Sequence, residues 1–144
     1  MTQHYNSTNE ALGTEAALID RQNKWEVVGT AIDGNFSLGA STTRCPSLIR
    51  KCQGPQVFDT FNDVAWVDLG INKKRFVLLG AVLFAESNIT GPEADMALST
   101  NPRIDWVDDN GATGSDVDVV TVIVHELGHV LGLGHSADPT AVMA

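Results

Sequence analysis

A run of eleven residues near the C-terminus, from His125 to His135, constrains this chain more than any other feature. It reads His-Glu-Leu-Gly-His-Val-Leu-Gly-Leu-Gly-His and holds three of the four histidines in the sequence. On an α-helix, residues i and i+4 lie about 40° apart around the axis, so His125 and His129 point the same way. Two imidazoles on one face can share a metal ion. The run therefore predicts a helix with a metal site on one face.

The rest of the run supplies a base and a third ligand. Glu126 follows His125 by about 100° of rotation, which places its carboxylate beside the metal rather than in line with it. That position suits a general base that acts on metal-activated water. Gly132 permits the positive φ that ends a helix and turns the chain, so His135 can approach from outside the helix. Three protein ligands leave a fourth position open, as in a catalytic zinc site rather than a structural one.

The spacing His-Glu-x-x-His-x-x-Gly-x-x-His is the signature of the metzincins, and the residues after it extend the resemblance. Ser136 follows the third histidine, and Met143 lies eight residues beyond His135. This arrangement resembles the Met-turn of the matrixins, the branch that contains the matrix metalloproteinases and related microbial enzymes. In that family the methionine forms an apolar floor under the metal and is not a ligand. The resemblance covers residues 9–144 and is strongest over 118–143.

The resemblance implies a zinc-dependent endopeptidase with an α+β, metzincin (zincin-like) fold. The expected fold is a mixed twisted sheet of four to five strands with a backing helix and an active-site helix. One zinc ion per chain would be held by His125, His129 and His135, with Glu126 as the catalytic base and Met143 in the Met-turn. The expected substrate is an extended protein or peptide, whose peptide bonds are hydrolysed by metal-activated water.

In matrixins the edge strand of the sheet lies along the rim of the active-site cleft, and by order and content residues 78–85 take that place here. An extended substrate can pair with such an edge by main-chain hydrogen bonds. Ala81, Val82 and Leu83 are then the expected backbone contacts, although their side chains can belong to the sheet core at the same time.

Length and charge limit the remaining function classes. A chain of 144 residues suits a single domain with one core. The net charge of −9 disfavours a nucleic-acid partner or an anionic membrane surface, because phosphates would be repelled. No apolar run approaches the length of a membrane span, and we expect a monomer. The polar N-terminus does not resemble a signal peptide, yet the family resemblance favours a secreted, extracellular protein.

Apolar spacing and turn residues predict the other elements. Residues 9–28 have the three-to-four spacing of a helix. Strands are expected at 30–38, 63–67, 77–85 and 93–98, and residues 39–60 read as a long surface loop. Asp118 is placed to cap a helix that opens with the β-branched run 119–124. Such residues form helices poorly, so burial under the sheet must hold this helix.

Two features leave alternatives open. Cys45 and Cys52 are the only cysteines, and their spacing is compatible with a small loop disulfide or with two free thiols. Calcium prefers oxygen ligands, which acidic residues of the later half of the chain could supply. The candidates are Asp95, Asp108, Asp109 and Asp116. Solvated acids in turns are the simpler interpretation of the same residues.

The chain departs from the matrixin pattern at both ends. Matrixins open with a strand before the first helix, for which Thr2–Asn6 is the only candidate remnant, and they continue past the Met-turn through the S1′ wall into a final helix. We therefore expect one matrixin-like catalytic domain over 1–144 without its first strand and C-terminal helix. The alternative functions are a catalytically inactive truncated metzincin domain that binds zinc or a partner, and a hydrolase of small amides.

Overall fold

The computed structural model describes residues 1–10, 14–27, 36–53, 55–70, 80–87, 91–108 and 113–144. Three helices and seven strands lie within these ranges. In chain order they are β1 (Thr2–Asn6), α1 (Thr14–Val27), β2 (Ser37–Leu38), α2 (Arg50–Gln53), β3 (Asn62–Val67), β4 (Gly80–Ser87), β5 (Gly91–Ser99), β6 (Trp106–Val107), β7 (Val117–Asp118) and α3 (Val119–Val130).

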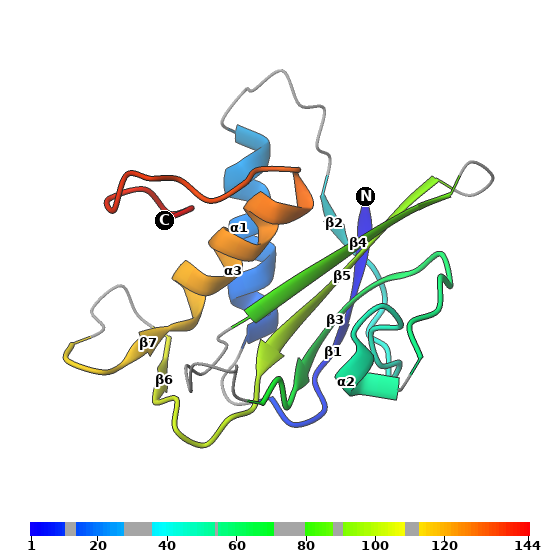
Figure 1. The fold of residues 1–144 in the computed structure, drawn as a ribbon, viewed down its shortest axis with the longest axis horizontal. Coiled ribbons are helices and arrows are strands. Elements are labelled where there is room, and N and C mark those ends of the chain that lie inside the picture. The colour runs from blue at the N-terminus through cyan, green and yellow to red at the C-terminus, as the bar shows by residue number, and fades with distance from the viewer. Residues whose placement is uncertain (11–13, 28–35, 54, 71–79, 88–90, 109–112) are drawn as a thin grey trace.

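Five strands form one mixed sheet in the order β2-β1-β3-β5-β4 (Figure 1). β1 pairs in parallel with both β2 and β3, and β3 pairs in parallel with β5. Among the described strands, β4 alone is antiparallel to its neighbour, with Ala81 opposite Ala97 and Leu83 opposite Asp95. Within the described part of the chain, β4 lies at one edge of the sheet. β6 and β7 form a separate two-stranded parallel ribbon just before α3.

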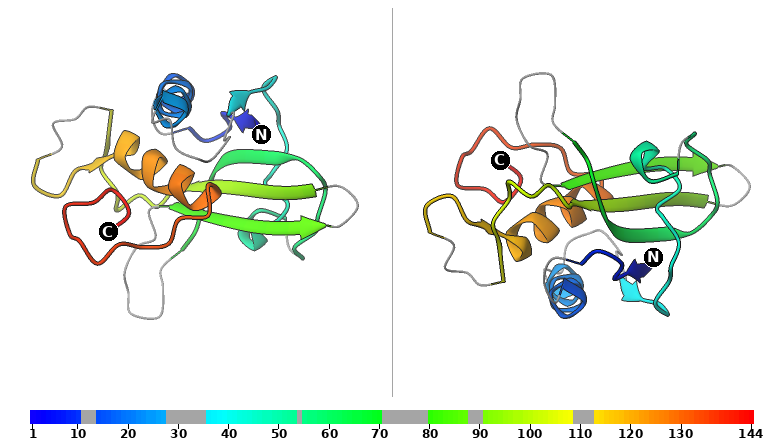
Figure 2. Two further views of the ribbon diagram at one scale, coloured as in Figure 1. Left: turned by 90° about the horizontal axis from the view of Figure 1, so that it is seen from above. Right: turned by 90° about the horizontal axis from the view of Figure 1, so that it is seen from below.

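Successive side chains of a strand point to opposite faces of the sheet, and both faces are covered by other segments. Val64 and Trp66 of β3 join the main core with α1 and α3, whereas Ala65 and Val67 pack with Ile49 beside α2. Figure 2 shows α1 and α2 on opposite sides of the sheet. Both long helices thus back one face, and the segment around α2 closes the other. This architecture confirms the expected α+β fold, with a backing helix and a second helix that carries the histidines.

Burial explains why α3 is a helix despite its β-branched sequence. The first turns hold four buried aliphatic residues, and two more follow. They are Val119, Val120, Val122, Ile123, Leu127 and Val130. Each buried side chain contributes about 1.5–3 kcal/mol, whereas a poor helix former costs at most about 0.7 kcal/mol. Tertiary packing therefore outweighs local preference. No helix in the described ranges has the length and apolar character needed to cross a bilayer.

The structure departs from the sequence expectations at several elements. The opening strand, expected to be missing, is present: Thr2–Asn6 forms β1, because Gln3 and Tyr5 are buried and both of its sides find a partner strand. The loop expected at 39–60 contains the short helix α2. Of the strand expected at 30–38, only its last residues are seen in β2; residues 30–35 and 77–79 lie outside the described ranges.

Candidate metal and catalytic site

The two ends of α3 form as the sequence predicts, and they determine where the histidines lie. The Asp118 side chain accepts hydrogen bonds from the backbone N–H of Val120 at 3.1 Å and of Thr121 at 3.0 Å, which caps the helix. The helix ends at Val130, and Gly132 has a φ of +84° that turns the chain back. This turn brings the segment containing His135 back beside the helix.

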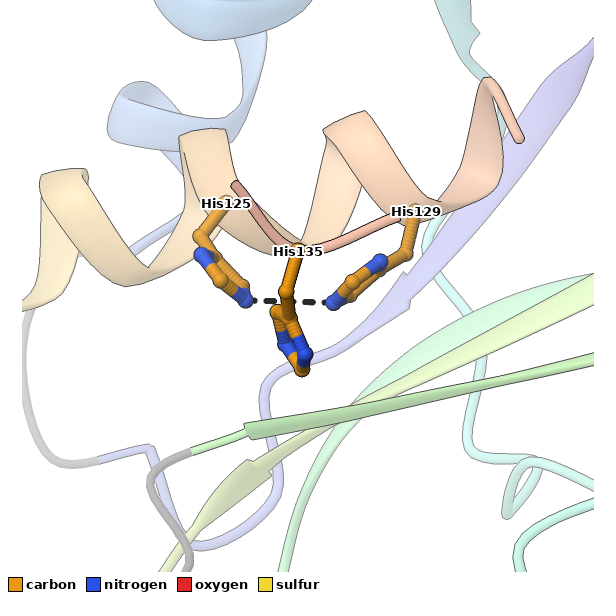
Figure 3. Close-up of side chains that lie close together, drawn as sticks. All are labelled: His125, His129 and His135. Carbon is orange, nitrogen blue, oxygen red and sulfur yellow. Dashed lines mark hydrogen bonds between the residues drawn. The ribbon is translucent and has the colours of Figure 1, made fainter. Parts of the chain in front are cut away.

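His125, His129 and His135 meet in one cluster, in which one ring nitrogen of each lies within 4.8 Å of the others. Figure 3 shows His125 and His129 projecting from α3 toward each other, with His135 between them from the segment after the helix. The Nε2 atoms of His125 and His129 are 3.1 Å apart. The ring centroid of His135 lies 5.2 Å from that of His125 and 4.9 Å from that of His129.

Backbone carbonyls orient the two helical imidazoles. The Nδ1 atom of His125 lies 2.7 Å from the carbonyl oxygen of Val142, and that of His129 lies 2.8 Å from the carbonyl oxygen of Leu133. A carbonyl can only accept, so each Nδ1 donates its hydrogen and each Nε2 presents a lone pair. Such contacts to the far ring nitrogen are the usual way in which proteins hold metal-ligating histidines.

The donor set fits a zinc ion. Two lone pairs at 3.1 Å repel each other unless a cation or a proton lies between them. Two nitrogen ligands of a tetrahedral zinc, each about 2.05 Å from the metal, would stand about 3.3 Å apart. Three imidazoles match the type and number of protein ligands in catalytic zinc sites. The cluster is thus suited to zinc in both chemistry and spacing.

Glu126 lies in the same helix and is buried, with 6% of its surface exposed. Its Oε2 atom is buried and has no hydrogen-bond partner in the described part of the chain. Burial raises the pKa of Glu126, while the neighbouring His125 and His129 act in the opposite direction. A buried carboxylate oxygen without a partner costs about 1–3 kcal/mol or more. Such a cost is typical of a group kept for chemistry rather than for stability.

Met143 packs against the same helix from the C-terminal segment. It is buried, and its Sδ atom lies next to the backbone of Gly128 in the middle of α3. The backbone N–H of Ser136 donates to the carbonyl of Met143, which closes the segment between them into a loop. The methionine therefore lies beside the helix that carries the histidine pair.

The three residues expected to contact substrate lie in β4. Ala81, Val82 and Leu83 pair with residues 95–97 of β5, and the other side of β4 has no partner strand among the described residues. β4 also packs against α3, where Gly80 lies next to the Glu126 side chain. The side chain of Leu83 is exposed, and its backbone is part of that edge.

The calcium expectation gains no support. Asp95 is fully buried, and its two oxygens accept the backbone N–H of Leu48 at 2.8 Å and of Asp63 at 2.9 Å. Asp109 lies outside the described residues. Within the described ranges, the three histidines are the one cluster of three or more potential metal-ligating side chains. Neither Asp108 nor Asp116 belongs to such a cluster.

The sequence analysis did not identify Glu93 as a buried acid. It left a disulfide between Cys45 and Cys52 as one of two alternatives. Glu93 is fully buried and accepts hydrogen bonds from the Ser47 hydroxyl at 3.0 Å and from the backbone N–H of Asp59 at 2.9 Å. Cys45 and Cys52 form a disulfide with a Cα–Cα distance of 5.6 Å. The alternation of Glu93 and Asp95 with Ala94 and Met96 was the available signal, since it places both acids on one face of a strand.

The histidine spacing, the helix–turn geometry and the buried Glu126 together define a metzincin type of site on an α+β fold. Comparison with protein families agrees: the family model of the matrixins matches residues 4–144. The chain therefore belongs to the matrixin family.

Relatives from a plant and from mammals match shorter segments. Metalloendoproteinase 1-MMP of Arabidopsis thaliana is 49% identical over 41 residues, which is 26% of this chain and 11% of the relative. Matrix metalloproteinase-16 of Homo sapiens is 70% identical over 27 residues, which is 19% of this chain and 4% of the relative, and the rat and mouse proteins match equally. The matched segments thus span a small part of each relative's length.

Proposed function

We propose that this chain is a zinc-dependent endopeptidase that hydrolyses peptide bonds of extended protein substrates. The observation that carries the proposal is the convergence of three imidazoles, two of them held through Nδ1 by backbone carbonyls, beside the buried and partly unpartnered carboxylate of Glu126. His125, His129 and His135 are the metal ligands in this proposal. Membership of the matrixin family supports the same assignment.

Each residue of the site has a distinct role in the reaction. The carbonyls of Val142 and Leu133 hold the ligand rings in the tautomer that directs Nε2 inward. His125, His129 and His135 would hold a zinc ion, which would act there as a Lewis acid toward water and the scissile carbonyl. Glu126 accepts a proton from the attacking water and then delivers it to the leaving amine. Its burial helps, because a raised pKa brings a carboxylate closer to the pH at which it must exchange protons.

The free edge of β4 is the proposed site of the substrate main chain. An extended peptide can add to this edge as a further strand, with the backbone of residues 81–83 as its partner. This binding mode suits unfolded or extended protein segments. The Cys45–Cys52 disulfide favours an oxidising compartment, and with the family membership it supports secretion as the proposed location.

Replacement of Glu126 tests the function most directly. Glu126→Gln should keep zinc and the folded state but lower kcat/KM on casein or a quenched peptide by two or more orders of magnitude, because a general base is lost. Glu15→Gln is a matched control, since Glu15 is exposed in the first turn of α1. Metal content is measured on all samples. Unchanged activity in Glu126→Gln would exclude Glu126 as the base.

Zinc content and peptide cleavage by the parent protein distinguish a peptidase from an inactive zinc-binding domain. A parent protein that binds one zinc per chain but cleaves no member of a mixed peptide library would favour the zinc-binding domain without turnover. Cleavage of the library that is abolished by 1,10-phenanthroline and restored by added zinc would favour the peptidase.

A further inference from the structure

Strand β4 begins at Gly80, and this glycine lies against the end of the Glu126 side chain. A Cβ atom built on Gly80 would be 2.6 Å from Oε1, 2.9 Å from Cγ and 3.0 Å from Cδ of Glu126. All three atoms belong to the outer part of one side chain. The carboxyl end of Glu126 therefore occupies the space that any other residue at position 80 would fill.

The backbone at position 80 does not itself require glycine. Gly70, Gly114 and Gly132 have positive φ values, but Gly80 does not, so an L-residue could adopt its conformation. Glycine within a strand normally weakens it, and its presence often marks a close approach by another group. Here the approaching group is the proposed catalytic base. Contact between α3 and β4 keeps the two residues facing each other.

An added methyl group would displace the carboxylate rather than the sheet. The atoms closest to the built Cβ are the far end of a flexible side chain, which can rotate away, whereas the β4–β5 pairing is fixed by eight opposed residue pairs. The fold should thus tolerate alanine at position 80. The base would then leave its place beside the histidines.

We infer that the missing side chain at Gly80 sets the position of the Glu126 carboxylate, which makes Gly80 a positioning residue for the general base. The inference rests on the proposed function, in which Glu126 moves the proton. Misplacement of a reacting group by about 1 Å can lower a rate about 100-fold. Gly80 is not needed for the histidines to bind metal or for the chain to fold. It acts through Glu126.

The first test is kinetic. Gly80→Ala should lower kcat about 10- to 100-fold, with KM changed less than about twofold and zinc content unchanged, because the substrate and metal contacts remain. Glu15→Gln is the control, since Glu15 is exposed in the first turn of α1 and lies outside the site, and it should retain parental kcat. A rise in KM with kcat preserved would mean that the methyl group blocks the substrate edge, and would overturn the inference.

A double-mutant cycle then asks whether Gly80 acts through Glu126. In a Glu126→Gln background, Gly80→Ala should cause little further loss of the residual kcat, because the base is already absent. A loss by the same factor in both backgrounds would show an independent effect and overturn the inference. Full activity of Glu126→Gln would instead refute the proposed function itself, so the two failures are distinguishable.

The second test needs neither metal nor substrate. In zinc-free protein, Gly80→Ala should lower the melting temperature when Glu126 is present, and should leave it unchanged or raise it in a Glu126→Ala background, where the space is free. An equal decrease in both backgrounds, or failure of both to fold, would show that the methyl group meets something other than Glu126. Either result would overturn the inference.

Discussion

The sulfur atom of Met143 lies so close to Gly128 that it occupies the space that a Cβ on this glycine would fill, with the Cε atom 3.0 Å from that position. The contact joins the C-terminal turn to the helix that carries His125 and His129. The residue before this methionine, Val142, supplies the carbonyl that accepts the Nδ1 hydrogen of His125. Packing of the methionine and orientation of a proposed metal ligand therefore depend on the same short turn.

Gly128→Ala should loosen this turn. Overpacking of a filled site costs about 1–3 kcal/mol, which exceeds the gain of up to about 1 kcal/mol from replacing a helical glycine by alanine. We expect a lower melting temperature and weaker zinc binding, because the Val142 carbonyl moves away from His125. Thermal unfolding and zinc titration measure the two effects, with Glu15→Gln in α1 as control. If both quantities stayed at parental values, the methionine contact would not support the metal site.

His129→Ala should abolish stoichiometric zinc binding, because two remaining imidazoles cannot hold zinc against water and buffer. Metal analysis of the parent should find about one zinc per chain, removable by chelation. His4→Ala is the matched control: His4 bonds the carbonyl of Ala40 at 3.0 Å and is not a member of the triad. Full zinc occupancy in His129→Ala would contradict the ligand assignment.

The sequence predicts well those features that depend on near neighbours in the chain. The cap at Asp118, the helix that follows it and the turn at Gly132 were all expected, because caps and helix periodicity act over a few residues. The grouping of the histidines follows from that helix and turn. The short elements α2, β6 and β7 were not expected, since four residues or fewer carry too weak a pattern.

Features that join distant segments could not be predicted in this way. Nothing local relates Gly80 to Glu126, because their contact depends on how α3 packs against β4. The sequence leaves Asp95 as a calcium candidate or a solvated acid, whereas in the structure it is buried and accepts hydrogen bonds from the backbone N–H groups of Leu48 and Asp63. Its alternation with Met96 shows which face it is on, but not which segment covers that face.

The burial of Asp95 predicts a specific pH dependence of stability. Burial, aided by the nearby Glu93 and Asp63 charges, raises its pKa from 3.8 to about 6, although its two N–H donors oppose this. The folded protein then binds the proton more tightly than the unfolded chain, so this residue's contribution is complete below about pH 4 and is lost as pH rises through about 6. A shift of this size corresponds to roughly 3 kcal/mol.

Zinc-free protein and its Asp95→Asn variant should therefore be unfolded by urea at several values between pH 4 and 7. We expect the parent's free energy of unfolding to fall relative to the variant's over this range, because asparagine does not titrate. Carbon NMR of the Asp95 carboxyl gives an independent check. A titration midpoint below pH 4 would show that the N–H donors of Leu48 and Asp63 outweigh burial.

Loss of the Cys45–Cys52 disulfide should destabilise the segment that covers the second face of the sheet. Closing a loop of about eight residues is worth about 2.5 kcal/mol in the chain-entropy description. This segment also carries Ile49, which packs on Ala65 and Val67, so its release exposes apolar surface. We expect the Cys45→Ser, Cys52→Ser double variant to lose about 2–3 kcal/mol in urea unfolding. Reduction of the parent by a phosphine should give the same loss and should not affect the double variant. Equal stability of oxidised and reduced parent would show that hydrogen bonds to Glu93 and Asp95 suffice to hold the segment.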